Sequence, residues 1–177
     1  MENKKGFIQI YTGNGKGKTT SAVGLAVRAR AYDLKVCYIY FHKEPDRWGH
    51  GEHTSLKKLG VDVFGFAKGH PLFDKDINSQ KVKDECLEAI NFIKKIYIEN
   101  KYDVLILDEI IISIRDGFLK EEEVIDILNT KPEKLELILT GRSASKNIIH
   151  KADLVSEIEN IKHPYDSGIQ GRKGIDY

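Results

Sequence analysis

A run of glycines, lysines and threonines at positions 12–20 has the composition and spacing of a phosphate-binding loop. Its residues are, in order, Thr12, Gly13, Asn14, Gly15, Lys16, Gly17, Lys18, Thr19 and Thr20. A β-prone segment (7–11) precedes the run and helix-forming residues follow it, which is the strand–loop–helix order that such a loop requires. Glycines let backbone N–H groups approach phosphate oxygens, and the N-terminus of the following helix favours the same anion. The sequence therefore predicts that residues 13–20 bind the phosphates of a nucleotide.

Individual side chains of this loop have distinct expected roles. Lys18 is placed to reach the terminal phosphates, and the Thr19 hydroxyl is placed to bind Mg²⁺. Thr12 stands where the general pattern G-x-x-x-x-G-K-[ST] has glycine, so we expect Gly13 and Gly15 to supply the flexibility of the loop. The alternative interpretation is a glycine-rich turn on a basic surface.

Charged residues near other predicted strand ends extend the candidate site. Asp108 and Glu109 follow the apolar run 104–107, as at a Walker-B-like strand end that holds Mg²⁺ directly or through water. Glu109 fits two roles, a metal ligand or the base that orients water in an ATPase. Arg142 can clamp a phosphate, and Arg28 can face the nucleotide from the helix after the loop. The alternatives are a helix-start acid pair for the two acids and surface ion pairs for the two arginines.

Strand-like and helix-like segments alternate along the chain, as in a parallel sheet with helices on both faces. The predicted strands are 7–11, 36–41, 61–66, 104–107, 135–139 and 154–158. The predicted helices are 18–31, 52–59, 79–100, 121–129 and 144–150. We therefore predict one α/β domain of the P-loop NTPase class over residues 1–177, with residues 1–5 frayed.

The carboxyl ends of the predicted strands mark the expected ligand site, because open parallel sheets bind ligands there. Four segments are expected to converge at this edge: 13–19, 41–43, 108–109 and 140–142.

Length and charge limit the kind of protein. The chain has 177 residues, with 28 lysines and arginines against 27 acids, for a formal net charge of +1. This balance gives no reason to expect nucleic acid or membrane binding. We see no apolar run of about 18 residues and no signal peptide, and we expect a cytoplasmic protein. Cys37 and Cys86 are predicted to be buried, reduced thiols rather than a disulfide.

Two loops contain further candidate residues. His42, His50 and His53 lie close together before the third strand but lack a recognised metal-ligand spacing, and we interpret their segment as a solvated loop. Trp48 in the same loop is a candidate contact for a flat ligand or a partner. Segment 67–78 is long for a compact domain, which makes it a candidate functional loop.

Several motifs, taken in order, resemble those of the P-loop type of ATP:corrinoid adenosyltransferases, the enzymes that adenosylate cob(I)alamin or cob(I)yrinic acid a,c-diamide. The motifs are loop 12–20, Leu107-Asp108-Glu109, Leu139-Thr140-Gly141-Arg142, 152–157, 162–165 and 174–177. The likeness extends from Gly6 to Tyr177. The phosphate loop alone does not identify the family, whereas the ordered set with its acid pair and C-terminal motifs is far more specific.

The resemblance implies a RecA-like α/β fold, usually homodimeric, that binds ATP, Mg²⁺ and a corrinoid. It implies transfer of the 5′-deoxyadenosyl group from ATP to Co(I) with release of triphosphate, in cobalamin biosynthesis or salvage. A reductase partner that converts Co(II) to Co(I) is also expected. Since Co(I) is itself a strong nucleophile, the protein has to position the ribose C5′ and neutralise the triphosphate.

The resemblance also assigns roles to individual residues. Lys18 and Arg142 are expected to act on the leaving triphosphate, with the γ-phosphate in the loop. Arg28 matches a position that contacts the nucleotide. Glu109 matches a metal ligand, which would act together with Thr19 and Asp108.

Two segments depart from the family pattern. Family members carry a Phe-Thr-Trp-type segment after the third strand, and its aromatic side chains form a wall against the corrinoid. The corresponding segment here, 66–73, has no tryptophan, so Phe66 and Phe73 are the candidates for this wall. Ile111 and Ile112 stand where the family has a polar pair after the two acids.

Two other functions are compatible with the same residues. One is a P-loop ATPase or kinase, with Glu109 acting on water or on an acceptor hydroxyl. The other is a non-catalytic nucleotide-binding protein that handles corrinoids. The products distinguish the three: triphosphate, ADP with phosphate, or none.

Overall fold

Six parallel strands form the centre of the protein, whose computed structural model describes residues 5–44, 49, 51–71 and 76–176. The strands are β1 (Ile8–Thr12), β2 (Val36–Phe41), β3 (Asp62–Phe66), β4 (Val104–Asp108), β5 (Glu136–Thr140) and β6 (Leu154–Glu157). Their order in the sheet is β3-β2-β4-β5-β1-β6, and each neighbouring pair is parallel. The predicted parallel α/β architecture is confirmed.

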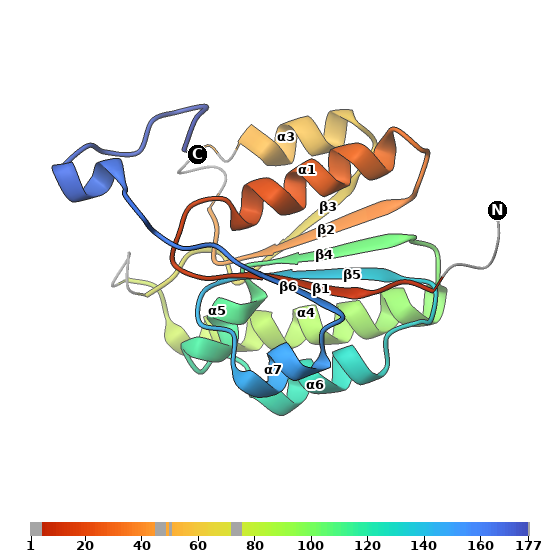
Figure 1. Cartoon of the computed structure of the whole chain (residues 1–177). Coiled ribbons are helices and arrows are strands. Elements are labelled where there is room, and N and C mark those ends of the chain that lie inside the picture. The colour runs from red at the N-terminus through yellow and green to blue at the C-terminus, as the bar shows by residue number, and fades with distance from the viewer. Residues whose placement is uncertain (1–4, 45–48, 50, 72–75, 177) are drawn as a thin grey trace.

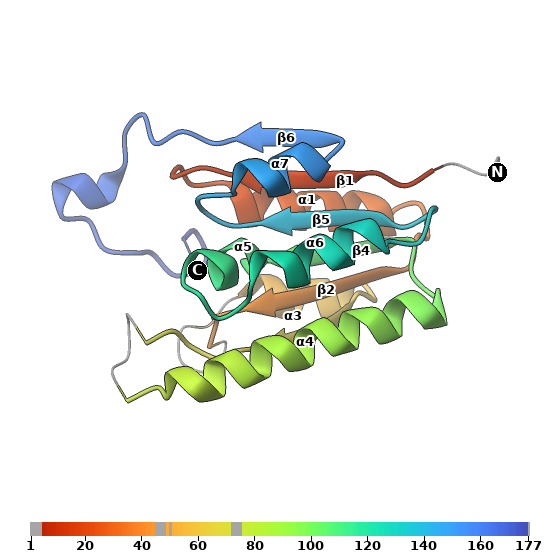
Figure 2. The same ribbon diagram turned by 90° about the horizontal axis from the view of Figure 1, so that it is seen from below.

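Helices cover both faces of the sheet (Figures 1 and 2). On one face lie α1 (Lys18–Arg30) and α3 (Gly51–Lys58). On the other lie α4 (Ser79–Glu99), α5 (Ile110–Arg115), α6 (Glu121–Asn129) and α7 (Lys146–Lys151). A short 3₁₀ helix, η1 (Pro164–Ser167), interrupts the C-terminal segment. Within the described part of the chain, no helix combines the length and the apolar character needed to cross a bilayer.

The core consists of two layers separated by the sheet. All six residues of β2 and all five of β4 are buried, and apart from Asp108 at the end of β4 both strands are continuously apolar, as expected for strands covered on both faces. The larger layer lies against the face that α4–α7 cover, and the smaller one lies under α1, where Ala22 and Ala26 allow close helix packing. Cys37 and Cys86 are buried free thiols, as predicted.

Helix α5 was not predicted from the sequence. It begins directly after Glu109, whose φ angle of 68° turns the chain at the end of β4. The helix has only six residues and starts with three isoleucines, which are β-branched and give no helical periodicity. Packing overrides this weak local signal, because Ile110 and Ile111 are buried in the core. The other predicted helices and strands begin and end within two residues of the observed ones.

His53 is buried, so the interpretation of its segment as a solvated loop is wrong at this residue. Helix α3 begins at Gly51 and turns His53 towards the sheet, where the side chain is 5% exposed. The imidazole stacks on Tyr40, with ring centroids 4.0 Å apart. His50 and Trp48 lie outside the described residues.

His42 is also packed rather than solvated, at the point where β2 ends. Its Nε2 lies 2.8 Å from Ser113 Oγ of α5, and its ring meets the His70 ring edge-on. His70 Nε2 in turn lies 2.8 Å from Asp116 Oδ2. Burial, followed by the neighbouring His70, lowers the pKa of His42 to about 4. The imidazole of His42 is therefore neutral in the folded protein at pH 7.

The depressed pKa of His42 predicts a pH-dependent loss of stability. The unfolded chain binds a proton at His42 below pH 6.5, whereas the folded protein resists protonation until about pH 4. The contribution of His42 is thus fully present above pH 6.5 and is lost as the pH falls towards 4, by roughly 3 kcal/mol in total. Urea unfolding between pH 7 and 4 should show a flatter pH dependence for His42→Asn than for the wild type.

Asparagine is the suitable replacement because His42 has a φ angle of 58°, which Asn tolerates. His150→Asn, on the exposed side of α7, is the matched control and should keep the wild-type slope. An unchanged slope in His42→Asn would show that this imidazole is not the group responsible.

Candidate nucleotide-binding site

The phosphate loop adopts backbone conformations that favour glycine at two positions. Gly13 and Gly17 have φ angles of 97° and 133°, a region that residues with a Cβ rarely adopt. Thr12 is the last residue of β1 and is 4% exposed. Its Oγ1 accepts a hydrogen bond from the Ala144 N–H at 3.3 Å. Thr12 is thus accommodated as a strand residue, and Gly13 supplies the turn, as predicted.

The need for Gly15 has a different cause from the one predicted. Gly15 has no positive φ, and its N–H donates to the Ile158 carbonyl at 2.7 Å. A Cβ on Gly13 would overlap with the backbone of Ile158, and one on Gly15 with that of Glu159. These residues follow β6, and Figure 1 shows their segment crossing the loop between β1 and α1. Gly15 therefore permits close contact with the C-terminal segment rather than flexibility.

Lys18 curls back over the loop. Its Nζ donates to the Gly15 carbonyl at 2.7 Å, and the residue is only 6% exposed. Burial lowers the pKa of Lys18, and the Arg142 charge acts in the same direction, whereas Glu109 and Asp108 oppose the change. The loop thus contains a buried cation beside backbone groups that suit an anion.

Asp108 lies at the centre of a buried polar network and is 0% exposed. Its Oδ1 accepts hydrogen bonds from the hydroxyls of Thr140, at 2.7 Å, and Thr19, at 3.0 Å. Its Oδ2 lies 2.6 Å from Lys43 Nζ. Burial by itself would raise the pKa of Asp108, but Lys43 and the hydroxyl donors hold it below its usual range. Burial would lower the pKa of Lys43, and Asp108 raises it instead.

In the part of the chain that the structure describes, the side chain of Glu109 lacks the ion pair that Asp108 forms with Lys43. Its N–H donates to Thr140 Oγ1 at 2.9 Å, but among the described residues its Oε2 has no hydrogen-bond partner although the atom is inaccessible to solvent. Burial raises the pKa of Glu109, and the Asp108 charge raises it further. An unsatisfied carboxylate oxygen beside a phosphate loop fits the oxygen-ligand preference of Mg²⁺.

A cavity of about 720 Å³ lies over the loop at the carboxyl ends of the strands. Its walls include Asn14, Gly15, Lys16, Gly17, Lys18, Thr19, Thr20, Val23, Lys43, Glu52, Ser55, Glu109 and Arg142. The C-terminal segment closes another side with His163, Pro164, Tyr165, Ile169, Gln170, Gly171, Gly174, Ile175 and Asp176. The four strand-end segments each contribute to the cavity, so their predicted convergence is confirmed. Lys16 Nζ also pairs with the Asp176 carboxylate across the opening.

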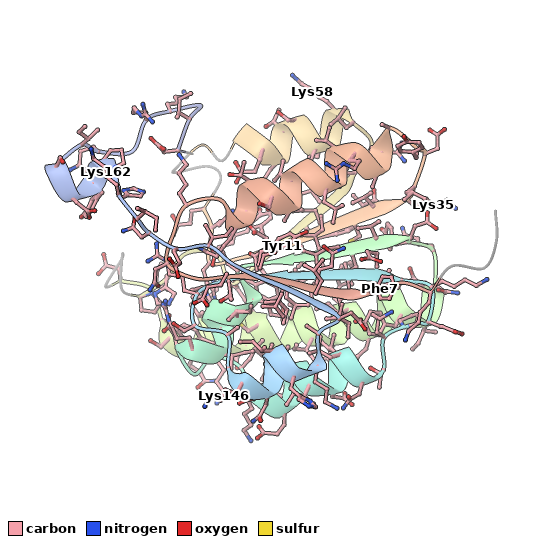
Figure 3. The ribbon with its side chains drawn as sticks, viewed as in Figure 1. Phe7, Tyr11, Lys35, Lys58, Lys146 and Lys162 are labelled. Atoms are coloured by element: carbon pink, nitrogen blue, oxygen red, sulfur yellow. The ribbon has the colours of Figure 1, made fainter. Side chains whose placement is uncertain are left out.

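The two candidate arginines differ in position. Arg142 lines the cavity beside Lys18 and Glu109. Arg28 is exposed on α1 and is not among the described residues that form the walls. Its charge acts on Tyr11, whose side chain is labelled in Figure 3 and packs against the core layer under α1. A role for Arg28 in nucleotide binding stays a prediction.

A second cavity, of about 520 Å³, borders the candidate loop 67–78. It is lined by His70, Pro71, Ser79, Gln80, Lys83, Asp116, Gly117 and Phe118. Phe66 is half-buried at the end of β3, and its ring centroid lies 5.6 Å from that of Phe92 on α4. Phe73, the other candidate for an aromatic wall, lies outside the described residues.

Sequence reasoning assigned no role to two residues of the site, Thr140 and Lys43. Both were placed at strand ends, but their link to Asp108 depends on pairing between strands that are distant in the chain. The only local signal for either is a polar residue at the end of a buried apolar strand, as for Thr140, or within two residues after it, as for Lys43. Thr140 is 0% exposed and bridges the two acids, and Lys43 is buried against Asp108.

The parallel sheet, the strand–loop–helix element and the strand-end acids define a P-loop nucleotide-binding protein. A solved structure of a KaiC-like protein from Pyrococcus horikoshii supports this fold. It superimposes with a TM-score of 0.58 at 16% sequence identity and covers 88% of this chain and 73% of its own.

Sequence comparison identifies the family within this class. The family model described as ATP:corrinoid adenosyltransferase BtuR/CobO/CobP matches residues 4–177. A corrinoid adenosyltransferase of Escherichia coli is 36% identical over 177 residues, which is 99% of this chain and 88% of the relative. The corrinoid adenosyltransferase of Salmonella typhimurium is 34% identical over 176 residues, with 99% and 88% covered. The chain belongs to the ATP:corrinoid adenosyltransferase family, and the predicted resemblance is confirmed.

The bridging position of Thr140 predicts that its hydroxyl stabilises the protein. In Thr140→Val, Asp108 loses a donor and the Glu109 N–H loses its acceptor, both in a buried setting. The free energy of unfolding, measured with urea, should fall by about 1–3 kcal/mol. Thr140→Ser retains the hydroxyl and is the control, which should lose much less. Equal stability of the two variants would contradict the role assigned to the hydroxyl.

Proposed function

We propose that this protein transfers the 5′-deoxyadenosyl group of ATP to the Co(I) of a reduced corrinoid, in cobalamin biosynthesis or salvage. Membership of the adenosyltransferase family supports the proposal. The structural observation that carries it is the single cavity that joins the phosphate loop to Lys18, Glu109 and Arg142. In the reaction, the cobalt electron pair forms the Co–C5′ bond, the C5′–O bond breaks, and its electron pair leaves with triphosphate.

The residues of the cavity suit this chemistry because Co(I) is the nucleophile, so the protein needs only to bind ATP and to neutralise its phosphates. The proposed ATP contacts are Gly13, Asn14, Gly15, Lys16, Gly17, Lys18, Thr19, Thr20, Arg28 and Arg142. Lys18 and Arg142 stabilise the negative charge that develops on the leaving triphosphate. Electrostatic stabilisation of this kind is most effective when the charges are fixed in a site that contains little water. The family resemblance supports an ATP orientation with the γ-phosphate in the loop.

A magnesium ion belongs to the proposal. Glu109 is the first candidate ligand because its Oε2 is buried and lacks a hydrogen-bond partner within the described part of the chain. Thr19 and Asp108, whose side chains are hydrogen-bonded to each other, complete the proposed ligand set, with Asp108 acting through a bound water. Mg²⁺ bound there would offset part of the triphosphate charge.

The corrinoid is proposed to bind beside the nucleotide, on the other side of the end of β2. Lys43 lines the larger cavity, and the preceding residue, His42, packs on His70, which lines the smaller one. The two cavities thus flank consecutive residues. This arrangement supports a place for the acceptor near loop 67–78, with Phe66 or Phe73 as the aromatic wall.

The family resemblance supports three further assignments. The protein is proposed to act as a homodimer, to receive Co(I) through a partner reductase, and to work in the cytoplasm. Sedimentation velocity of the purified protein tests the first of these directly.

Lys18→Met should remove most of the activity and leave the fold intact. The expected loss of rate is on the order of 10²–10³-fold, because a buried cation no longer meets the triphosphate. The assay contains ATP, Mg²⁺ and chemically reduced cobalamin, and it follows the corrinoid spectrum together with the phosphorus products. Lys58→Met, at the exposed end of α3 (Figure 3), is the matched control and should behave as the wild type.

The products in the same assay decide between the proposed function and its alternatives. Triphosphate with an adenosylated corrinoid supports the transferase. ADP and phosphate would support an ATPase or kinase, and unchanged ATP with bound corrinoid would support a non-catalytic protein. Full activity in Lys18→Met would contradict the role of the phosphate loop.

Glu109→Gln distinguishes a metal ligand from a catalytic base. If Glu109 holds Mg²⁺, the variant has weakened metal affinity, and raising the Mg²⁺ concentration should restore a large part of its rate. If Glu109 instead accepts a proton from water, added Mg²⁺ should not restore the rate, because the glutamine cannot take up that proton. Initial rates of the variant over a Mg²⁺ titration provide the measurement, with Glu122→Gln on the exposed side of α6 as the control. Absence of rescue, together with ADP release by the wild type, would favour the ATPase.

A further inference from the structure

Lys43 is a buried cation that none of the roles described so far requires. It follows β2, and its side chain is 11% exposed. Its Nζ lies 2.6 Å from Asp108 Oδ2 and 3.3 Å from Glu52 Oε1 of α3. Lys43 therefore connects the centre of the sheet to α3, and Lys43 and Glu52 both line the nucleotide cavity.

The two adjacent acids have unequal surroundings. Asp108 Oδ1 accepts hydrogen bonds from the hydroxyls of Thr19 and Thr140. Its Oδ2 is buried like Glu109 Oε2, but it forms an ion pair with Lys43 Nζ at 2.6 Å. Glu109 has no such ion pair among the described residues, and its Oε2 has no hydrogen-bond partner there. A carboxylate whose charge is already compensated by a lysine at 2.6 Å is a poor direct ligand for a cation, whereas one without an ion pair is available.

We propose that Lys43 is a positioning residue of the nucleotide site, which neutralises Asp108 and holds it as an anchor for Thr19 while leaving direct coordination of the cation by a carboxylate to Glu109. The inference rests on the proposed ATP site and deepens it. Asp108 ties the first turn of α1 to β5 through Thr19 and Thr140, so its geometry sets the position of the phosphate loop. Without Lys43, a buried negative charge would face the phosphates and would attract a cation to Asp108.

Lys43 acts through Asp108 rather than through ATP, and this distinction can be measured with a double-mutant cycle. The variants are Lys43→Met, Asp108→Asn and the double variant. The readouts are the affinity for ATP in the presence of EDTA, by calorimetry, and the affinity for Mn²⁺ without nucleotide, by electron paramagnetic resonance. Neither readout depends on turnover.

Opposite changes in the two affinities are the expected result. Lys43→Met adds one uncompensated negative charge, so it should weaken ATP binding by about tenfold and strengthen Mn²⁺ binding by a similar factor. The double variant removes the charge again and should return both affinities to near the wild-type values. A surface pair of similar geometry, Lys94 and Asp126 at 2.8 Å, provides the matched control, and Lys94→Met should change neither affinity.

Three outcomes would overturn the inference. If the double variant keeps the whole loss of ATP affinity, Lys43 contacts the nucleotide directly. If Lys43→Met retains both wild-type affinities, the ion pair serves only the fold. If the wild type binds no ATP, this inference and the proposed function both fail.

Two further results separate the inference from problems of folding or turnover. If Lys43→Met does not fold, the double variant, in which Asp108 no longer carries a charge, is expected to fold and to bind ATP and Mn²⁺ as the wild type does. Failure of that binding also contradicts the inference. A wild type that binds ATP but transfers no adenosyl group would contradict the proposed function, while the binding cycle would still decide the role of Lys43.

Discussion

The buried charge of Asp108 is the constraint on which the rest of the site depends. A carboxylate that is 0% exposed stays ionised only if cations and hydrogen-bond donors replace its hydration. Three different elements supply these groups: the chain after β2 through Lys43, α1 through Thr19, and β5 through Thr140. The compensation of one charge thereby fixes the relative positions of the phosphate loop and two strand ends.

The C-terminal segment imposes a second constraint on the same loop. Ile158 exchanges backbone hydrogen bonds with Thr12 and Gly15, and it lies where a Cβ on Gly13 would be. The glycines of the loop therefore serve two purposes, close approach of a phosphate and close approach of the chain itself. Thr12 is accepted because its side chain points towards Ala144, away from this contact. At positions 13 and 15, any side chain would overlap with the backbone of Ile158 or Glu159.

The sequence predicts those features that depend on residues close together in the chain, and it does not predict contacts between residues that are far apart in it. Continuous apolar strands and a helical period predict the parallel sheet, because such patterns depend on near neighbours in the chain. The phosphate loop is likewise a local motif. The partners of Asp108 are not local: Thr19 is 89 residues away and Thr140 is 32 away, so composition and spacing cannot connect them. The burial of His42 could not be predicted for the same reason, because its partner Ser113 is 71 residues away in the chain.

Register is the final link between the fold and the site. Strands buried on both faces, such as β2 and β4, carry no inside–outside alternation, so their apolar residues alone specify the pairing register weakly. Polar contacts at both ends remove this ambiguity. At the amino end, the Lys35 N–H donates to Asp103 Oδ2 at 2.7 Å, and the Asp103 N–H donates to the Lys35 carbonyl at 2.9 Å (Figure 3 labels Lys35).

At the carboxyl end of β2, Lys43 pairs with Asp108 on the side of α3, and His42 meets Ser113 of α5 on the opposite side. If β2 slipped by one residue along β4, the neutral imidazole of His42 would take the place of the Lys43 cation, and Asp108 would be buried without its counter-charge. Lys43 would then lie among the apolar side chains of the larger core layer. The contacts that shape the nucleotide cavity therefore also select the strand register, so the sheet and the site are specified together.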